Sequence, residues 1–538
     1  MVLAESKKWV VEYSCQLKKG HSIANARKQM KRAANPKIQL NLGDPSITLL
    51  HRAGMAGLWM TLKKLKQIYP TPAQRIGRLT WQLTPCSISL DWEGQDFTVL
   101  DWLLKQSFQI SDEGLISLTG LNPEKMDIQT KIIIHQGITE TFTQHNKFFK
   151  SAGQEFKQLT IDGVELRVDY KKAAWYAHQH FAKYLCDQYG QLLQELVGIT
   201  GWLYPGAVVR HYAFQKETKF EEKTEHALAL LFAPVACQYF AIRAHTNPQD
   251  TKYVLVVPEV IDLELCAQYF WSLNNLNYKD FHVSSLGDAG LKFLTYETTQ
   301  QATSNFIKRC QAISFSTVPW SKQQKTRTEI VFIELNSSVS SLYKLSCICF
   351  SKYQLVFYKN QLFILSSLVK GIIANNLVMG FPWWTNFSLK IKNNKLFQEN
   401  VHDYIGIYQM IQQYEWDIEA QKLFVKACHE ALQKIYTKIY SRTKEGEYAQ
   451  IERENTRILS QLRRCTNAGN FRKFIAEFWA TAGQISILEE HWAELLPLTT
   501  GMGNWKVARD LTFIAIASYP RSKTKETELL KTSELNAE

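Results

Sequence analysis

The sequence lacks every common signature of a metal site or a catalytic centre. Its ten cysteines include no CxxC pair, which argues against structural zinc, and their wide spacing favours reduced thiols over a disulfide framework. No GxxxxGK[ST] or GxGxxG phosphate loop appears, and neither HExxH nor GxSxG is present. We therefore expect a binding protein rather than an enzyme, with no cofactor and no bound metal.

Long apolar runs are also missing. The N-terminus reads MVLAESKKWVVEYS and has no apolar signal core. The longest apolar run, Ala227 to Ile242, contains Pro234 and Gln238, and it falls short of the ~20 residues that a membrane span needs. The sequence therefore predicts a cytoplasmic protein without a membrane partner.

Two short patterns leave a catalytic alternative open. His178 and His180 form an HxH, but on a helix they would point about 200° apart and could not share a metal ion. His402-Asp403 is an HD dipeptide, a pair that metal-dependent phosphohydrolases and nucleases use together with several further His and Asp ligands. No companions are evident, so a nuclease stays the alternative to a binding protein.

Positive charge is the strongest compositional signal. The 538 residues include 63 Lys and Arg against 50 Asp and Glu, a formal net charge of +13. This length predicts two to four domains. Basic side chains release counterions from phosphates, so the surplus favours a polyanionic partner. A scaffold protein whose charge serves solubility alone is the other interpretation.

The charge gathers in two clusters. Residues 1–37 carry a net +7, and three of their basic residues share one helical face near Asn35: Lys28, Lys31 and Arg32. Residues 434–473 carry a net +6. Helical spacing there forms two basic stripes that can follow a phosphate backbone. The candidate nucleic-acid-binding residues of this second cluster are Lys434, Lys438, Arg442, Arg453, Arg457, Arg463, Arg464, Arg472 and Lys473.

Hydrophobic periodicity predicts an α+β protein. A helix should start at Asp44-Pro45, bury a stripe that includes Leu50 and Leu58, and let another backbone approach at Gly54 and Gly57. Alternating or apolar runs predict strands, and Lys359-Asn360 should join a hairpin. The predicted strands are 86–92, 164–170, 253–257, 330–333, 355–358 and 361–365, with strand-like character also around Cys347 and Cys349.

The predicted organisation has four parts. A basic segment spans residues 1–37, and a mixed α/β body with helices near 171–196 and 262–276 spans 38–395. Residues 396–518 should form an antiparallel bundle of four or five helices, separated at Gly446, Gly469 and Gly501. The polar residues 519–538 should be disordered.

Two segments carry a family resemblance. IQLNLGDPSITLLHRAGMAGLW runs from Ile38 to Trp59, and GWLYPGAVVRHYAF runs from Gly201 to Phe214 before LALLFAPVACQYF. Both resemble the large subunit of type I CRISPR–Cas surveillance complexes (Cascade), in the MYXAN branch that accompanies type I-A, type I-B and some transposon-associated systems. The similarity extends over most of the chain, and residues 1–35 match it least.

The resemblance implies a non-catalytic subunit of an RNA-guided DNA-binding complex. Such a subunit reads the PAM, helps to part the target duplex and stabilises the R-loop, so that a nuclease or a transposase is recruited. The implied partners are guide RNA, double-stranded target DNA and its displaced strand, the Cascade backbone and guide-end-capping subunits, and in some systems transposition proteins. Small subunits translated from within the same gene are implied as well, with Met379 and Met410 as in-frame starts.

Base reading needs polar side chains in loops, with Lys or Arg on the flanking phosphates. Arg210 and His211 lie in a family-like segment and either contact nucleic acid or satisfy buried carbonyls. Three further segments look like suitable loops, although each is also compatible with an ordinary solvated loop. They contain Lys31, Arg32 and Asn35; Asn274, Asn275, Asn277 and Lys279; and Lys370, Asn375 and Asn376.

Overall fold

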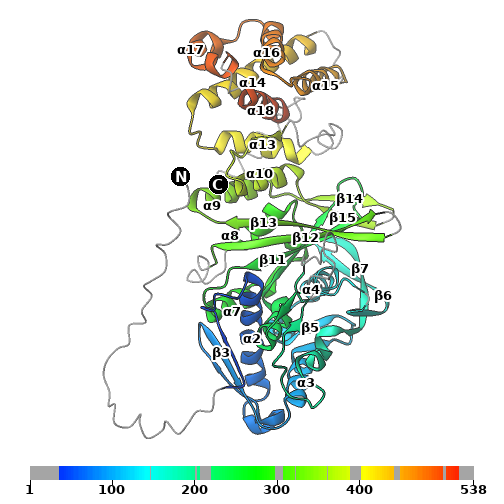
Figure 1. Ribbon diagram of the computed structural model, residues 1–538. Helices are drawn as coiled ribbons and strands as arrows, with labels where there is room; N and C mark the ends of the chain where they lie inside the picture. The colour runs from blue at the N-terminus through cyan, green and yellow to red at the C-terminus, as the bar shows by residue number, and fades with distance from the viewer. Residues whose placement is uncertain are drawn as a thin grey trace, which may run out of the picture.

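The fold is known from a computed structural model of the chain, shown in Figure 1. It describes residues 36–519 apart from these segments: 146, 200–202, 206–219, 297–306, 321–322, 360, 388–400, 442–448 and 501–504. The described part consists of a mixed α/β body with a tower of helices at one end (Figure 1). This arrangement confirms the predicted α+β class. The four predicted part boundaries stay a prediction.

Helix α2 (Leu49–Ile68) runs through the centre of the body, and most of its side chains are buried. The predicted stripe is confirmed, since Leu50 and Leu58 are both in the core. Its predicted start was wrong. The helix begins after Thr48, because Asp44 accepts hydrogen bonds from Ser46 in the preceding turn instead of capping the helix.

The two glycines of α2 allow the close approach that the sequence predicts. A Cβ at Gly54 would lie 2.1 Å from the Ala229 carbonyl oxygen in α6 (Thr224–Leu231). A Cβ at Gly57 would lie 2.1 Å from the carbonyl oxygen of Phe232. Both neighbours are backbone atoms, so α2 and the α6 segment are in contact at a distance that only glycine permits.

The body also contains two larger β-sheets. One has three antiparallel strands in the order β1-β3-β2, and the other has four in the order β10-β11-β12-β13. Their bounds are β1 Ile38–Asn41, β2 Thr80–Leu83, β3 Ser87–Asp91, β10 Gln238–Arg243, β11 Thr251–Pro258, β12 Arg309–Trp320 and β13 Gln323–Glu334. Strand β11 is buried as predicted, but β13 is not buried on both faces, because Ile330 and Phe332 are exposed while Ile333 is in the core.

Helices cover the sheets and connect them to two hairpins. The helices of the body are α3 Asp96–Ser107, α4 Ile128–Glu140, α5 Ala182–Leu185, α7 Leu263–Ser272, α8 Leu286–Thr295, α9 Ser337–Cys349 and α10 Leu368–Val378. The remaining strands are β4 Phe108–Ile110, β5 Ile116–Leu118, β6 Phe149–Ile161, β7 Val164–Tyr176, β8 Val197–Gly198, β9 Glu221–Glu222, β14 Gln354–Tyr358 and β15 Gln361–Leu365. The hairpin predicted across Lys359-Asn360 is confirmed as β14–β15.

Two elements of the body differ from expectation. The segment 171–196 is not a helix, because β7 continues to Tyr176 in register with β6 and is followed by short turns. The strand-like run at Cys347 and Cys349 is the end of helix α9, whose N-terminus is capped by Asn336. In both cases the periodicity of the apolar residues over a short run did not distinguish helix from strand.

The C-terminal tower contains six helices within the described residues, one or two more than predicted. They are α13 Val401–Gln413, α14 Glu419–Tyr440, α15 Ala449–Arg463, α16 Ala468–Ala482, α17 Ser486–Thr500 and α18 Trp505–Ser518. Helix α14 packs against α16, α17 and α18, and α13 joins the bundle to α9 and α10 of the body. Gly469 does not interrupt a helix, because it lies in the first turn of α16 after the Asn467 cap. No helix in the described ranges is long and apolar enough to cross a membrane.

Candidate nucleic-acid interface

Several predicted site residues lie outside the described part of the chain. They are Lys28, Lys31, Arg32 and Asn35 of the basic N-terminal segment, Arg210 and His211 of the family-like segment, and Arg442 of the bundle. The side chain of Asn275 is outside it as well.

Two predicted loop residues are buried, which corrects their assignment as nucleic-acid contacts. Asn274 is 7% exposed, and its Nδ2 donates a 3.0 Å hydrogen bond to the Leu121 carbonyl. Lys370 lies in α10, where its Nζ is 3.3 Å from Asp288 Oδ1. Burial acts to lower the pKa of Lys370, but the Asp288 carboxylate raises it overall. Both side chains stabilise the body and are not free to reach a base edge or a phosphate.

The neighbouring asparagines are also engaged. Asn375 Oδ1 accepts from the Gly287 backbone N–H, and the Asn376 amide donates to the carbonyls of Trp383 and Thr385. These residues belong to α10 and the turn after it, so the segment is not the predicted open loop. Lys279 remains at the surface, where its Nζ pairs with Asp162 at 3.0 Å.

Two basic residues of the bundle serve its own structure. Lys438 Nζ donates to the carbonyl oxygens of Thr481 and Ala482, both at 3.0 Å. Lys434 pairs with Glu430 at 3.0 Å and also donates to the Gln484 carbonyl. These carbonyls lie at the C-terminal end of α16, where positive charge is favourable. Lys434 and Lys438 of the first predicted stripe therefore contact the end of α16, and the contact of this stripe with a phosphate backbone stays a prediction.

The second stripe is different, because most of its side chains are exposed on α15 and α16. Arg457 pairs with Glu454 of its own helix, and Lys473 is 79% exposed in its side chain. Arg463 is half-buried, and burial lowers its pKa. The exposed basic residues of this surface, which we call the α15–α16 face, are Arg453, Arg457, Arg464, Arg472 and Lys473.

A cleft of about 500 Å³ opens beside these residues. The side chains of Phe474 and Phe478 lie in its lining, with ring planes 3° from parallel and centroids 6.0 Å apart. Arg457 lines the same cleft. Both rings are buried, at 6% and 5% exposed, and the exposed side chains that line the cleft include Arg457 and Glu477.

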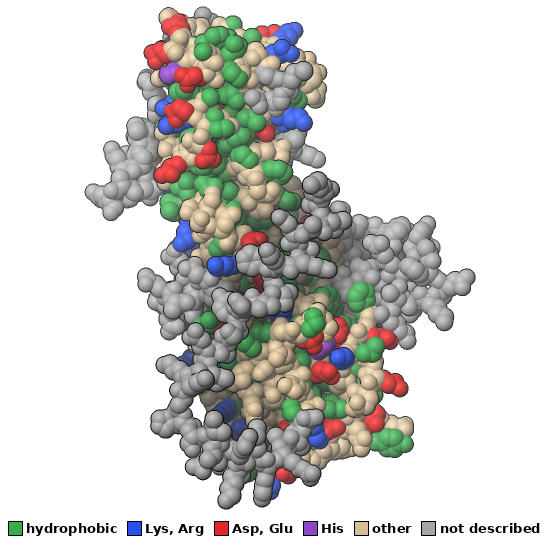
Figure 2. All heavy atoms as spheres, turned by 60° about the vertical axis from the view of Figure 1, so that its left-hand side comes forward, with side chains coloured by type: hydrophobic (Ala, Val, Ile, Leu, Met, Phe, Trp, Pro, Cys, Tyr) green, Lys and Arg blue, Asp and Glu red, His purple; other side chains and the backbone are tan. Residues whose placement is uncertain are grey.

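The bundle carries both signs of charge. In Figure 2 acidic side chains are frequent on the left of the upper tower, and the basic side chains on its right edge stand among acidic ones. The exposed acids of α17 include Glu489, Glu490 and Glu494, and the α15–α16 face itself contains the exposed Glu452 and Glu477.

Two hairpins of the body form a second candidate surface that the sequence analysis missed. The β6–β7 and β14–β15 hairpins are neighbours, since Gln361 donates a 2.8 Å hydrogen bond to Asp169, and Figure 1 shows them along one edge of the body. Phe156 is 43% and Phe357 is 70% exposed. The Arg167 guanidinium lies 4.1 Å from the centroid of the Phe156 ring. The alternation of apolar and polar residues in β7 predicts one buried face and one exposed face. The sequence analysis did not consider the exposed face as a binding surface.

The structure does not support the nuclease alternative at His402-Asp403. Asp403 is 2% exposed, and it accepts hydrogen bonds from the Ser367 side chain and from the backbone N–H groups of Leu368 and Val369. It thus binds the N-terminus of α10, although burial still raises its pKa to about 6. Among the described residues, Asp403 belongs to no group of side chains spaced to hold a metal ion.

Comparisons with known proteins match this two-part architecture. A family model described as the DevT N-terminal domain matches residues 39–231, and one described as the DevT C-terminal domain matches residues 412–538. The chain is also 26% identical to the CRISPR-associated protein Cas8a1/Csx13 of Myxococcus xanthus (strain DK1622), over 94% of this chain and 93% of that protein.

The fold and these matches define a protein of the DevT type, with an α/β N-terminal body and a helical C-terminal domain. More specifically, the chain belongs to the family of large subunits of type I CRISPR–Cas surveillance complexes. This membership confirms the resemblance seen in the sequence. The Myxococcus xanthus relative is named a CRISPR-associated protein, and large subunits of this family are generally non-catalytic.

Proposed function

We propose that this chain recognises the PAM, helps to open the target duplex and holds the displaced strand, without catalysing a reaction itself. The observation that carries the proposal is the α15–α16 face, where five basic side chains are exposed and one of them, Arg457, lines a cleft of about 500 Å³. Phosphates pair with exposed Arg and Lys, so this surface suits the backbone of single-stranded DNA.

The salt dependence of DNA binding tests this assignment. We expect that replacing Arg453, Arg457, Arg464, Arg472 and Lys473 together with Ala weakens binding of the assembled complex to its target. Each lost contact to a single strand lowers the slope of log affinity against log salt by roughly 0.7, so the five together lower it by about 3.5. The PAM preference should not change, because these side chains face phosphates.

The matched control removes exposed charge elsewhere in the bundle. Lys426 on α14 and Lys506 on α18 are exposed and lie outside the α15–α16 face. Their double Ala variant should retain the salt slope of the unaltered complex. If the unaltered complex, the five-residue variant and the double control variant all have the same salt slope, the α15–α16 face does not contact DNA.

We propose that the paired hairpins take part in opening the duplex. A wedge needs exposed aromatic side chains that replace a lost base stack, with positive charge for the flanking phosphates. Phe156 and Phe357 supply the exposed rings, and Arg167 supplies the charge beside the first of them. Lys279 is not part of this group, because its partner Asp162 is at the turn between β6 and β7, six residues along the strand from Phe156.

Substrates that differ only in base pairing test the wedge. We expect the Phe156→Ala/Phe357→Ala variant to bind an intact target duplex at least about 30-fold more weakly, since each of the two base–aromatic stacks contributes about 1–3 kcal/mol. A target with a preformed bubble beside the PAM should bind normally. Phe332→Ala, which alters a 69% exposed ring on β13, is the matched control. A loss that is equal for both substrates would contradict a role in strand separation.

We also propose Met379 as the better of the two internal starts for a small subunit. Met379 follows α10 and is 65% exposed, and a product beginning there keeps Trp383 and the link from the Asn386 N–H to Asp510 in α18. Met410 is fully buried within α13. A product beginning at Met410 would lack most of α13 and expose the core that this helix covers.

A C-terminally tagged gene reports on the start site. We expect a short tagged product that disappears with Met379→Leu and persists with Met410→Leu. Both substitutions conserve side-chain volume, so the full-length chain should accumulate normally in each case. A short product that begins at Met410 would reverse the assignment.

A further inference from the structure

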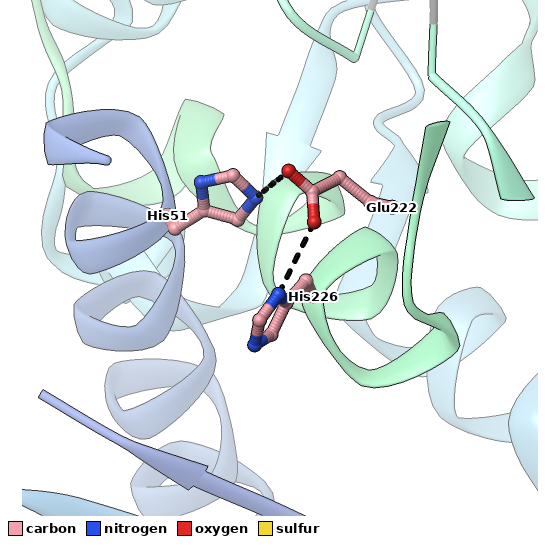
Figure 3. Close-up of side chains that lie close together, drawn as sticks. All are labelled: His51, Glu222 and His226. Atoms are coloured by element: carbon pink, nitrogen blue, oxygen red, sulfur yellow. Dashed lines mark hydrogen bonds and ion pairs between the residues drawn. The ribbon is translucent and has the colours of Figure 1, made fainter. Parts of the chain in front are cut away.

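Three potential metal ligands from separate segments meet beside the first turn of α2. His51 belongs to α2, Glu222 ends β9, and His226 belongs to α6 (Figure 3). Glu222 lies between the two rings, with Oε1 3.5 Å from His51 Nε2 and Oε2 3.2 Å from His226 Nδ1. One ligand atom from each residue lies within 4.8 Å of the other two.

The cluster is buried, and one of its nitrogen atoms has no hydrogen-bond partner. The side chains of His51 and His226 are 1% and 5% exposed, and that of Glu222 is 24% exposed. His51 Nε2 is a buried polar atom without a hydrogen bond, and Figure 3 shows it facing Glu222. Leaving such an atom unsatisfied costs about 1–3 kcal/mol, so this nitrogen favours a further partner.

The other nitrogen of each ring already faces an oxygen atom. Asp44 Oδ2 is 3.4 Å from His226 Nε2, and Thr48 Oγ1 is 2.9 Å from His51 Nδ1. Histidine ligands of metal ions donate their second N–H to such oxygen atoms, which sets the ring orientation and the tautomer. The two oxygens thus leave His226 Nδ1 and His51 Nε2 as the nitrogen atoms available to an ion, and both face Glu222.

We propose that His51, Glu222 and His226 form a binding site for a divalent transition metal ion, with zinc as the ion that fits best. Two imidazole nitrogens and a carboxylate oxygen are ligands that zinc accepts, and the part-exposed Glu222 leaves room for a water ligand. With bonds of about 2.1 Å, tetrahedral ligand atoms are about 3.4 Å apart. The His–Glu distances of 3.5 Å and 3.2 Å end on the two different oxygens of Glu222, and one ligand atom from each residue lies within 4.8 Å of the other two. The three side chains therefore need to move closer by up to about 1.4 Å around an ion.

Charge and packing support the same assignment. Asp44 and Glu222 together supply two negative charges, which balance a divalent cation. The close packing of α2 on α6 at Gly54 holds the two rings 5.5 Å apart between centroids. A bound ion would cross-link the start of α2 to the segment that carries β9 and α6. The site is independent of the proposed DNA-binding surfaces.

Without an ion, the Thr48 backbone N–H donates to His51 Nδ1 at 3.2 Å, which places the imidazole proton on Nε2. Metal binding at Nε2 requires that proton to leave, and a proton on Nδ1 would then be donated to Thr48 Oγ1. The alternative to a metal site is a cluster of histidine–carboxylate contacts in which His51 Nε2 keeps its proton and no metal ion binds.

Zinc titration of the full chain separates these two states. Chelator-treated protein is titrated with Zn²⁺, and bound zinc and the thermal unfolding temperature are measured. The protein carries Cys15→Ser and Cys86→Ser, because the Cys86 thiol is exposed and Cys15 lies outside the described residues. We expect one tightly bound Zn²⁺ per chain and a rise in the unfolding temperature. Co²⁺ in place of Zn²⁺ should give the visible absorption of a low-coordinate site.

Substitutions at the cluster are expected to lower zinc affinity by different amounts. Glu222→Gln removes a ligand at a part-exposed position and should lower zinc affinity at least 100-fold while the metal-free protein remains folded. Asp44→Asn acts through His226 and should lower it by about 10- to 100-fold. His145→Gln alters an exposed histidine outside the cluster and should have no effect. No zinc-dependent shift in the unaltered chain, or equal zinc binding by Glu222→Gln, would overturn the proposal.

Discussion

Alanine at Gly54 or at Gly57 is expected to destabilise the body by more than about 3 kcal/mol, at the upper end of the range for overpacked cores. The new Cβ would lie 2.1 Å from a backbone carbonyl oxygen in either case, at Ala229 or at Phe232. Neither oxygen belongs to a flexible side chain, so the helix itself would have to shift. Urea unfolding of the purified chain measures the loss, and the soluble yield should fall with it.

Two other glycines provide matched controls. Gly469 is an exposed residue within helix α16, where Ala should stabilise the protein by up to about 1 kcal/mol. Gly198 has open space around its Cβ position, so Ala is tolerated there. If Gly54→Ala unfolds at the same urea concentration as Gly198→Ala, α2 does not pack on α6 as described.

Acidification from pH 7.5 to pH 5.5 is expected to lower the free energy of unfolding by at least about 3 kcal/mol. Burial lowers the pKa of His135 and of His429 to about 4, and that of His178 to about 3, from the usual 6.5. Below pH 6.5 the unfolded chain binds protons that the folded chain does not, so stability is lost as the pH falls. Each histidine contributes about 1.4 kcal/mol of that loss by pH 5.5.

Asp403 opposes this trend, because its raised pKa of about 6 makes the folded chain bind a proton as the pH falls. One such carboxyl offsets less than 1 kcal/mol over this range, by the order of magnitude of these shifts, so the histidines dominate. The variant His429→Gln should reduce this pH-dependent loss by about 1.4 kcal/mol. The variant His145→Gln, at an exposed position, should not change it. A free energy of unfolding that increases as the pH falls from 7.5 to 5.5 would contradict the burial of these rings.

The sequence predicted the parts of the fold in which a hydrophobic pattern extends over many residues. It also predicted the parts in which the backbone geometry favours a particular residue type. The apolar stripe of α2 covers five turns, and its glycines pointed to close packing, which the Ala229 and Phe232 carbonyls confirm. The hairpin at Lys359-Asn360 was predicted because a left-handed turn residue stands between two apolar runs, and Lys359 has a φ of 45°.

Predictions failed where the outcome depended on contacts distant in the sequence. Asn274 and Lys370 looked like loop residues, and only the fold brings them to Leu121 and to Asp288. Lys434 and Lys438 share one face of α14, as their spacing predicts, and the spacing did not indicate that both would contact carbonyl oxygens at the end of α16. Helical spacing identifies a shared face and does not say what that face contacts.

The cluster at His51 could not be found from spacing. Glu222 and His226 are four residues apart, yet His51 lies far earlier in the chain, and no short motif joins them. The family resemblance was the part of the functional analysis that the comparisons confirmed. The DNA-contacting residues remain predictions, because neither the fold nor the resemblance assigns them.

The most direct test of the central claim is PAM-dependent binding by a reconstituted complex. The chain is co-expressed with its partner subunits and a guide RNA, and binding to matched duplexes with different flanking motifs is measured with and without it. We predict that tight binding requires both this chain and a short flanking motif, and that the complex alone does not cut DNA with magnesium or manganese. Target binding that is unchanged without the chain, or insensitive to the flanking motif, would contradict its role as the PAM-reading subunit.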